Sequence, residues 1–270
     1  MSIINENNNQ LVAPAAYAEA AVLANTIGEE MLTRLEWMAL QPSVIVDVGC
    51  GVGYCASLLQ ARYPTATVIA LDVAYPMLAH AKQQEKTDKL AFVCADALRL
   101  PLPDHSADIV FANLVLPWLA NAEEVVREWR RVLRPGGLLM FTSLGPDTLQ
   151  AWRDKLGDFT LPHFIDMHEI GDALTRVRFS DPVMDVDYFT LTYRERHAFF
   201  TELQASGMII PACYENLIPD DVLLRNAEHK LEITYEVVYG HAWGPECDAD
   251  HVADEFGTVK IPLAHLRRRW

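Results

Sequence analysis

The sequence predicts an α/β protein built on a doubly wound, mostly parallel sheet of seven strands. Strand-like and helix-like segments alternate between residues 44 and 143, which is typical of a parallel sheet with helices on both faces. A glycine-rich run at residues 49–53 joins the first strand to the first helix of this alternation. Asp72 ends the next strand-like run. Because ligands bind at the carboxyl ends of such strands, the two features predict a ligand site there.

The elements of the sheet follow a helical N-terminal segment. Residues 15–40 are predicted to form one or two helices, because apolar residues such as Leu23, Ile27 and Met31 recur at helical spacing. Residues 134–137 are predicted to form a tight turn before the fifth strand. The alternation places strands at 44–48, 67–71, 91–94, 109–112 and 138–143, and helices at 54–62, 76–84 and 122–133.

The pattern changes after residue 143. Helices are predicted at 167–177, 195–206 and 220–229, and strands at 183–192 and 231–239. The two late strands are expected to complete the sheet as an antiparallel edge, with the helices between them as a cap over the ligand site. The chain thus divides into an N-terminal tail and helical lid (1–41), a cofactor-binding core (42–192), a helical cap (193–230), and a final strand with a C-terminal tail (231–270). Residues 1–9 are expected to be disordered.

Composition excludes several classes of function. The chain has 270 residues, 51% of them apolar, enough to bury a substantial core. No run of about 18 apolar residues occurs, so no membrane span is expected. The polar N-terminus lacks a signal-peptide pattern, which predicts a cytoplasmic protein. The formal net charge of −15 argues against nucleic-acid binding, and a monomer is expected.

The cysteines and histidines indicate no metal site. The five cysteines form no C-x-x-C pair and are odd in number, which favours reduced thiols over disulfides or zinc ligands. The nine histidines form no H-E-x-x-H motif, and we predict no metal. Cys50 lies in the glycine run, where its small size explains it better than reactivity does.

The glycine run predicts a nucleoside-cofactor site. Gly49, Gly51 and Gly53 let a strand turn sharply into a helix and let backbone N–H groups approach a ligand. From Gly51 the run also fits the G-x-G-x-x-A pattern of dinucleotide sites. A dinucleotide would place an anionic pyrophosphate there, yet Asp47 precedes the glycines and the run has no Lys or Arg. We therefore predict S-adenosylmethionine, whose sulfonium and ammonium groups suit a nearby carboxylate.

Asp72 is the predicted ribose ligand. An acidic side chain at the end of the second strand can accept hydrogen bonds from both ribose hydroxyls. Val73 and Met77, which follow it, are assigned to the same cofactor site, as is Cys50 in the glycine run. The alternative is a glycine turn that only packs a helix on a strand.

The next two strand ends extend the predicted site. Asp96 and Ala97 follow the third strand, where a carboxylate can accept from the adenine amino group and a backbone N–H can meet a ring nitrogen. The alternative for Asp96 is an ordinary turn residue. Asn113 and Leu114 end the fourth strand and would lie beside the methionine part of the cofactor. Trp118, on the next turn, would either line the site or pack in the core.

These features, in this order, resemble the class I S-adenosylmethionine-dependent methyltransferases. Four further stretches extend the resemblance beyond the core: residues 145–149 with Arg153, 164–172, 181–185 and 234–243. They resemble the malonyl-[acyl-carrier protein] O-methyltransferase family of biotin synthesis. The resemblance implies methylation of the free carboxylate of a malonyl thioester on an acyl-carrier protein, with S-adenosylmethionine as cofactor. A small-molecule carboxyl methyltransferase and a non-methylating assembly factor of the same fold are the alternatives.

The same resemblance suggests three residues for the reaction. Tyr17 matches a family tyrosine on an N-terminal helix that closes over the cofactor, and a buried structural tyrosine is the competing interpretation. Arg153 is the candidate anchor for the carboxylate or thioester of the substrate. The alternative is that it is an ordinary surface arginine on a helix. His168 could donate to the substrate, or act as a structural hydrogen-bonding residue. The stretch at residues 11–16 and Arg178 depart from the family pattern.

Two basic surfaces could dock an acidic carrier protein. We call the first the cap cluster; it is preferred because it lies near the expected mouth of the site, and it consists of Arg194, Arg196, Arg225 and Lys230. We call the second the arginine stripe; it follows one face of a predicted helix and consists of Arg127, Arg130, Arg131 and Arg134. An ordinary solvated helix face is the alternative for the stripe.

Overall fold

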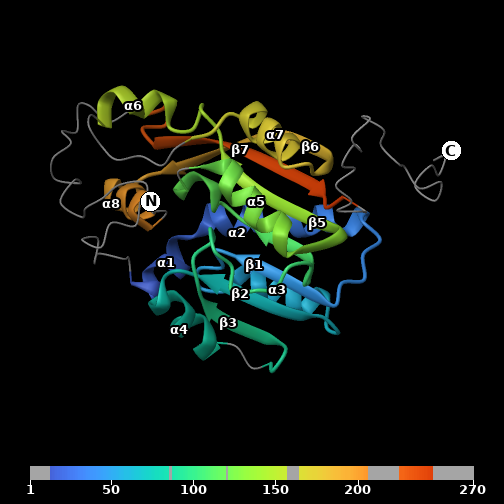
Figure 1. Ribbon diagram of the computed structural model, residues 1–270. Helices are drawn as coiled ribbons and strands as arrows, with labels where there is room; N and C mark the ends of the chain where they lie inside the picture. The colour runs from blue at the N-terminus through green and yellow to red at the C-terminus, as the bar shows by residue number, and fades with distance from the viewer. Residues whose placement is uncertain (1–12, 85–86, 120, 157–163, 206–224, 246–270) are drawn as a thin grey trace, which may run out of the picture.

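The structure is a computed structural model that describes residues 13–84, 87–119, 121–156, 164–205 and 225–245 (Figure 1). Helices and strands alternate through most of it, as predicted. The helices are α1 (Pro14–Ala20), α2 (Val22–Arg34), α3 (Tyr54–Arg62), α4 (Tyr75–Gln84), α5 (Ala122–Val132), α6 (Gln150–Leu156), α7 (Met167–Arg176) and α8 (Arg196–Ala205). The strands are β1 (Val44–Val48), β2 (Thr67–Asp72), β3 (Leu90–Cys94), β4 (Ala107–Ala112), β5 (Leu133–Leu144), β6 (Ser180–Tyr193) and β7 (Leu231–Trp243).

The seven strands form one sheet in the order β3-β2-β1-β4-β5-β7-β6. The five strands from β3 to β5 are parallel to their neighbours. β7 pairs antiparallel with β5, and β6 pairs antiparallel with β7. The predicted seven-stranded sheet with two late strands at an antiparallel edge is therefore confirmed. The chain order reverses between β1 and β4, which is where a doubly wound sheet opens for a ligand.

Helices cover both faces of the sheet (Figure 1), and an apolar cluster lies on each face. On one face Ile27 of α2 and Leu59 of α3 pack with Phe111 of β4 in a cluster that extends to α6 and α8. On the other face Trp129 of α5 packs with Val110 of β4 in a cluster that extends to α7. Neighbouring residues of a strand point to opposite faces, so the nearly continuous apolar strands of the sequence serve both layers.

Several element boundaries differ from those predicted. Residues 225–229 were predicted to end a helix, and this is wrong for the part that the structure describes. Asn226 instead accepts hydrogen bonds from the backbone N–H groups of Glu228 (2.9 Å) and Lys230 (3.0 Å). A side chain that bonds its own backbone in this way favours a turn over a helix. The short helix α6 was missed.

β5 begins five residues earlier than predicted, because Leu133 already pairs with Ala107. The register then jumps from Ala107–Leu133 to Ile109–Leu138, so residues 134–137 bulge out of the strand. Gly136 has φ +69° there, a conformation that glycine adopts without strain. The predicted tight turn is thus a bulge within a longer strand.

Some predictions fall outside the described residues. They include the disordered residues 1–9, the first part of the 220–229 helix, and most of the C-terminal tail. Within the described ranges, none of the helices has the length and apolar character needed to cross a membrane. Those ranges also hold no group of three or more His, Cys, Asp or Glu side chains that could bind a metal ion.

Two glycine substitutions are expected to change stability in opposite directions. In β7, a Cβ on Gly240 would lie 2.2 Å from the ring of Phe141, its cross-strand partner. Gly240→Ala should lower the free energy of unfolding by about 1–3 kcal/mol, since overpacking forces the core to shift.

In α7, the nearest atom to a Cβ on Gly171 is 3.9 Å away. Gly171→Ala should raise stability by about 0.5–1 kcal/mol, because alanine favours a helix. Urea titrations check both, and equal effects would contradict the packing described for Phe141.

Candidate functional site

Three glycines shape the turn between β1 and α3. Gly49, Gly51 and Gly53 have φ values of +69°, +53° and +81°, which other residues rarely adopt. A Cβ on Gly49 would lie 2.4 Å from Cγ2 of Val115, and one on Gly53 would lie 3.0 Å from Cβ of Ala81. Gly49 and Gly53 are therefore required both by the backbone conformation and by the close approach of neighbouring elements, and Gly51 is required by its backbone conformation.

Asp72 lies at the end of β2 and holds this turn. Its carboxylate accepts hydrogen bonds from the backbone N–H groups of Gly51 (2.8 Å) and Ala74 (2.8 Å). Burial raises the pKa of Asp72, and the bonds from Ala74 and Gly51 act against that rise. Next to it, the side chain of Val73 is half exposed and Met77 is nearly buried. The structure thus places the predicted ribose ligand beside the glycine turn.

Asp47 lies beneath the turn and is only 1% exposed. Burial, and then the charge of Asp72, raises the pKa of Asp47 to about 8. Its Oδ2 has no hydrogen-bond partner among the described residues. A carboxyl whose pKa is raised in this way gains from a nearby cation, which would stabilise its ionised form. An uncompensated carboxyl oxygen suits a cationic ligand and disfavours a pyrophosphate.

The other polar groups around the turn are a thiol and a phenol. The pKa of Cys50 is raised, mainly by burial, which fits an unreactive small residue. The ring of Tyr17, on α1, would lie 3.5 Å from a Cβ on Gly51. Burial, and then the charge of Asp72, raises the pKa of Tyr17 to about 12. The contacts of α1 with both α4 and α8 fix the position of Tyr17. Its phenol is neutral and lies over the glycine turn.

Asp96 follows β3 and organises a local turn. Its Oδ1 accepts a hydrogen bond from the backbone N–H of Leu98 (2.9 Å), and its carbonyl accepts from the N–H of Arg99 (3.0 Å). The turn interpretation weighed for Asp96 is therefore supported by the geometry. Ala97 is partly buried in the same turn. Their role toward adenine stays a prediction.

Asn113 and Leu114 directly follow β4 and belong to a hydrogen-bonded network that the sequence predicted only in part. Nδ2 of Asn113 donates to the carbonyl of Ala24 on α2 (2.8 Å). The hydroxyl of Thr142 on β5 donates to Oδ1 of Asn113 (2.8 Å) and accepts from the N–H of Leu114 (2.9 Å). Thr142 is fully buried, and Leu114 has φ +56°. The signal for Thr142 was a polar residue directly after the apolar run at residues 138–141.

Arg153, on α6, is occupied by its own loop. Nη2 donates to the carbonyls of Pro146 and Thr148, the second at 2.9 Å. The guanidinium stands 5.0 Å from the ring centre of Phe164. Nε is buried without a partner among the described residues. The arginine therefore orders the segment that follows β5, and only part of its donor capacity remains for a substrate.

His168 lies in the first turn of α7, with its side chain 79% exposed. Its Nδ1 lies 2.7 Å from Oδ1 of Asp166, which also accepts the backbone N–H of His168 as the helix N-cap. This geometry favours the structural interpretation of His168. Its contact with a substrate stays a prediction.

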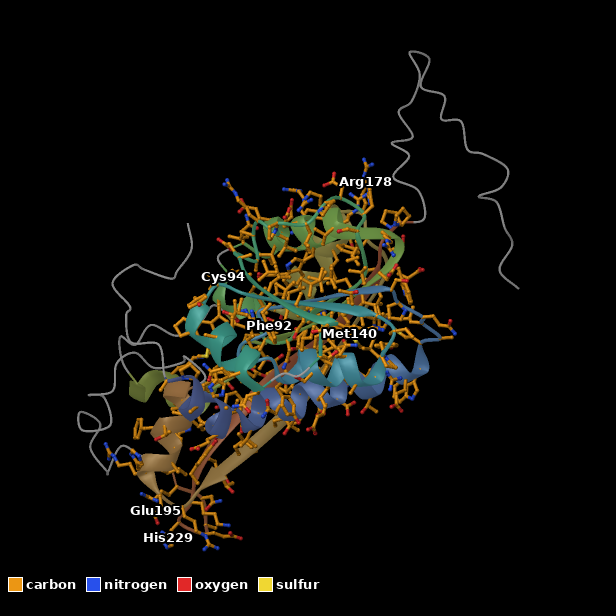
Figure 2. All side chains as sticks on the ribbon, turned by 90° about the horizontal axis from the view of Figure 1, so that it is seen from below. Phe92, Cys94, Met140, Arg178, Glu195 and His229 are labelled. Carbon is orange, nitrogen blue, oxygen red and sulfur yellow. The ribbon has the colours of Figure 1, made fainter. Side chains whose placement is uncertain are left out.

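The structure brings the cap cluster to one end of the molecule. Arg194 and Arg196 follow β6, and Arg225 and Lys230 precede β7, whose first residue pairs with the last residue of β6. Figure 2 shows Glu195 and His229 close together at this end, far from Arg178. The cluster is of mixed charge, because Lys230 Nζ lies 2.6 Å from Oε2 of Glu228.

The arginine stripe is largely engaged within the protein. Only three of its arginines lie on α5, because this helix ends at Val132 and Arg134 lies in β5, so the predicted helix face is wrong at Arg134. Arg127 pairs with Glu123 (2.6 Å), Arg131 with Asp104 (2.6 Å) and Arg134 with Asp108 (2.5 Å). Arg131 also donates to the carbonyls of Leu100 and Leu102. These ion pairs within the protein explain the stripe without a partner protein.

Solved structures share this fold. The YcgJ protein of Bacillus subtilis superposes with a TM-score of 0.62 over 81% of this chain and 99% of its own, at 17% identity. Phosphoethanolamine N-methyltransferase 2 of Haemonchus contortus, solved with S-adenosylhomocysteine, has a TM-score of 0.58 over 89% of this chain and 58% of its own, also at 17% identity. At these identities the likeness concerns the fold alone.

Sequence relatives are more informative. Residues 46–141 match the family model described as a methyltransferase domain. The malonyl-[acyl-carrier protein] O-methyltransferase of Laribacter hongkongensis is 40% identical over 264 residues, covering 86% of both chains. The protein of the same name from Methylovorus sp. is 38% identical over 263 residues, covering 87% of this chain and 86% of its own. The chain therefore belongs to the malonyl-[acyl-carrier protein] O-methyltransferase family.

Proposed function

We propose that this protein transfers a methyl group from S-adenosylmethionine to the free carboxylate of a malonyl group held by acyl-carrier protein, for the pimeloyl part of biotin. We further propose that it acts as a monomer in the cytoplasm. The names of the relatives support the substrate. The observation that best supports the cofactor site is the position of two carboxyls beside the glycine turn, the buried Asp47 and the partly buried Asp72.

The chain is a methyltransferase by family, and its cofactor is S-adenosylmethionine, as predicted. The residues present fit this group. Asp72 offers carboxylate oxygens for a ribose, and Asp47 has an unpartnered oxygen for a cation. The cofactor supplies an activated methyl group, and no further cofactor is needed for its transfer.

The reaction needs positioning more than acid–base catalysis. A malonyl carboxylate is already ionised near pH 7, so no general base is required. Methyl transfer is an in-line displacement, for which a near-attack arrangement of the reactants lowers the barrier most. We assign Tyr17 to covering the cofactor and excluding water. Arg153 would steady the substrate through the donors of its guanidinium that its own loop does not use, leaving the attacking oxygen free.

The direct test uses S-adenosylmethionine with a labelled methyl group. Malonyl-, succinyl- and acetyl-carrier proteins, and in parallel free dicarboxylates, are incubated with the enzyme and analysed for base-labile methyl ester. Label is expected on malonyl-carrier protein and absent from acetyl-carrier protein, which has no free carboxylate. Cofactor binding without any ester would support the assembly-factor alternative, and labelling of free dicarboxylates alone would support the small-molecule alternative.

Charge reversal in the cap cluster tests the proposed docking surface. The double variant Arg194→Glu/Arg196→Glu should raise the KM for malonyl-carrier protein and leave the affinity for S-adenosylmethionine intact. Charges at the rim of an interface mainly affect how fast two proteins associate and how they align. Malonyl-coenzyme A lacks the carrier protein and should be affected much less. Arg127→Glu, at an exposed position of the arginine stripe, tests the alternative surface in parallel and should leave the KM for malonyl-carrier protein unchanged. Unchanged carrier-protein kinetics in the double variant would move the docking surface to the stripe.

A further inference from the structure

A threonine side chain continues the contact between β4 and β5 where their backbone pairing ends. The last paired residues of the two strands are Ala112 and Phe141. Thr142 comes next on β5, with its side chain fully buried. Its hydroxyl accepts from the N–H of Leu114 (2.9 Å) and donates to Oδ1 of Asn113 (2.8 Å). Backbone N–H groups inside a protein need an acceptor, and for Leu114 a side chain supplies it.

Leu114 has an uncommon backbone conformation. Its φ is +56°, in the left-handed region whose cost for a residue with a Cβ corresponds to a factor of about ten in population. A conformation of this kind persists only where the surrounding structure fixes it. The hydrogen bond from Leu114 to Thr142 provides such a constraint. Loss of the hydroxyl would therefore allow the segment after β4 to relax.

The segment after β4 borders the glycine turn. Val115 directly follows Leu114 and is nearly buried. Its Cγ2 lies 2.4 Å from the position that a Cβ on Gly49 would take, so Val115 packs directly against the backbone of the turn. A change in the conformation of Leu114 would move Val115 relative to Gly49. This contact lies at the carboxyl ends of β1 and β4, where the sheet opens for a ligand.

Asn113 extends the same network to the helix α2. Its Nδ2 donates to the carbonyl of Ala24 (2.8 Å) and lies 3.8 Å from Sγ of Cys55 on α3. One turn after Ala24, a Cβ on Gly28 would lie 2.4 Å from that Sγ and 3.2 Å from Nδ2 of Asn113, so α2 is closely packed here. Because the hydroxyl of Thr142 donates to Oδ1, it orients the amide so that Nδ2 faces α2.

We infer that Thr142 is a positioning residue for the binding of S-adenosylmethionine. It acts through Leu114 and Asn113, which it holds against the glycine turn and α2. Its fully buried side chain has no surface left for a ligand, so its effect on the cofactor is indirect. The inference rests on the cofactor site of the proposed function. A threonine that only fills the core is the competing interpretation, and that role needs the volume of the side chain but not its hydroxyl.

Thr142→Val removes the hydroxyl and keeps the volume and the β-branched shape that strands favour. The dissociation constant of S-adenosylhomocysteine should rise about tenfold, the factor that corresponds to the cost of the left-handed conformation. Thr142→Ser keeps the hydroxyl and should restore most of the affinity. Thr190→Val is the matched control, because it removes a hydroxyl that bonds Thr234 (3.1 Å) on the edge strand β6, and it should leave the affinity unchanged.

Leu114→Gly separates positioning from core packing. Glycine adopts the left-handed conformation without strain, so Thr142→Val should weaken binding much less in the Leu114→Gly background than in the wild type. Calorimetry gives the affinities of the four proteins, and urea titration gives their stabilities. An unchanged affinity in Thr142→Val, or the same loss in both backgrounds, would overturn the inference. If Thr142→Val alone does not fold, recovery of folding in the double variant supports the inference, and a double variant that also fails to fold contradicts it.

These measurements need no methyl acceptor. Binding of S-adenosylhomocysteine by the wild type without any ester on malonyl-carrier protein would therefore contradict the proposed substrate and leave the role of Thr142 supported or refuted by its own variants. Wild-type affinity in Thr142→Val, together with methylation of malonyl-carrier protein, would contradict the positioning role alone.

Discussion

Asp72→Ala is expected to weaken the binding of S-adenosylmethionine by about 10- to 150-fold. Hydrogen bonds to a charged group contribute about 1.5–3 kcal/mol, which converts to this range of dissociation constants. The structure adds a second reason, because the carboxylate of Asp72 also fixes the N–H groups of Gly51 and Ala74. Loss of the side chain removes both the ribose ligand and the support of the glycine turn.

Calorimetry with S-adenosylhomocysteine measures this effect, and circular dichroism shows whether the variant is folded. Asp72→Asn keeps the shape and one acceptor oxygen, so its loss of affinity should be smaller. Asp172→Ala, at an exposed position of α7, controls for removal of a surface carboxylate. An unchanged affinity in folded Asp72→Ala would exclude Asp72 as the ribose ligand.

Features with a local cause were predictable from the sequence. The positive φ values of Gly49, Gly51 and Gly53 are a demand of the turn itself, and glycine is the residue that meets it. Asp72 was predictable because it is the acidic last residue of an otherwise apolar strand segment. The strands of the sheet were predictable from local sequence as well, because apolar runs bounded by turn residues are typical of buried strands.

Features that depend on contacts between distant segments were not predictable. Thr142 became a site residue only when β5 was placed beside Asn113 and Leu114. Arg153 was a candidate anchor by resemblance, yet two carbonyls of its own loop occupy Nη2. Helical periodicity also failed at residues 225–229, where the side chain of Asn226 bonds the backbone ahead of it. In each case a specific hydrogen bond outweighed the pattern.

Gly49→Ala is expected to lower the free energy of unfolding by about 2–5 kcal/mol. The left-handed conformation costs about 1–2 kcal/mol for a residue with a Cβ, and overpacking adds about 1–3 kcal/mol. The clash is with Val115, whose Cγ2 would lie 2.4 Å from the new methyl group. Because the turn must shift to relieve it, affinity for S-adenosylhomocysteine should fall as well.

The protein contains its own control for the two causes. Gly136 has the same φ of +69°, but a Cβ at this position would have no atom within 4 Å, so Gly136→Ala should lose only the conformational part, about 1–2 kcal/mol. Val115→Ala removes the clashing methyl groups, and Gly49→Ala combined with Val115→Ala should be less destabilised than the sum of the single variants. Equal losses for Gly49→Ala and Gly136→Ala in urea titrations would show that the contact with Val115 does not constrain the turn. A larger loss at Gly49, relieved by Val115→Ala, would show that close packing against the segment after β4, together with φ, requires glycine at the cofactor site.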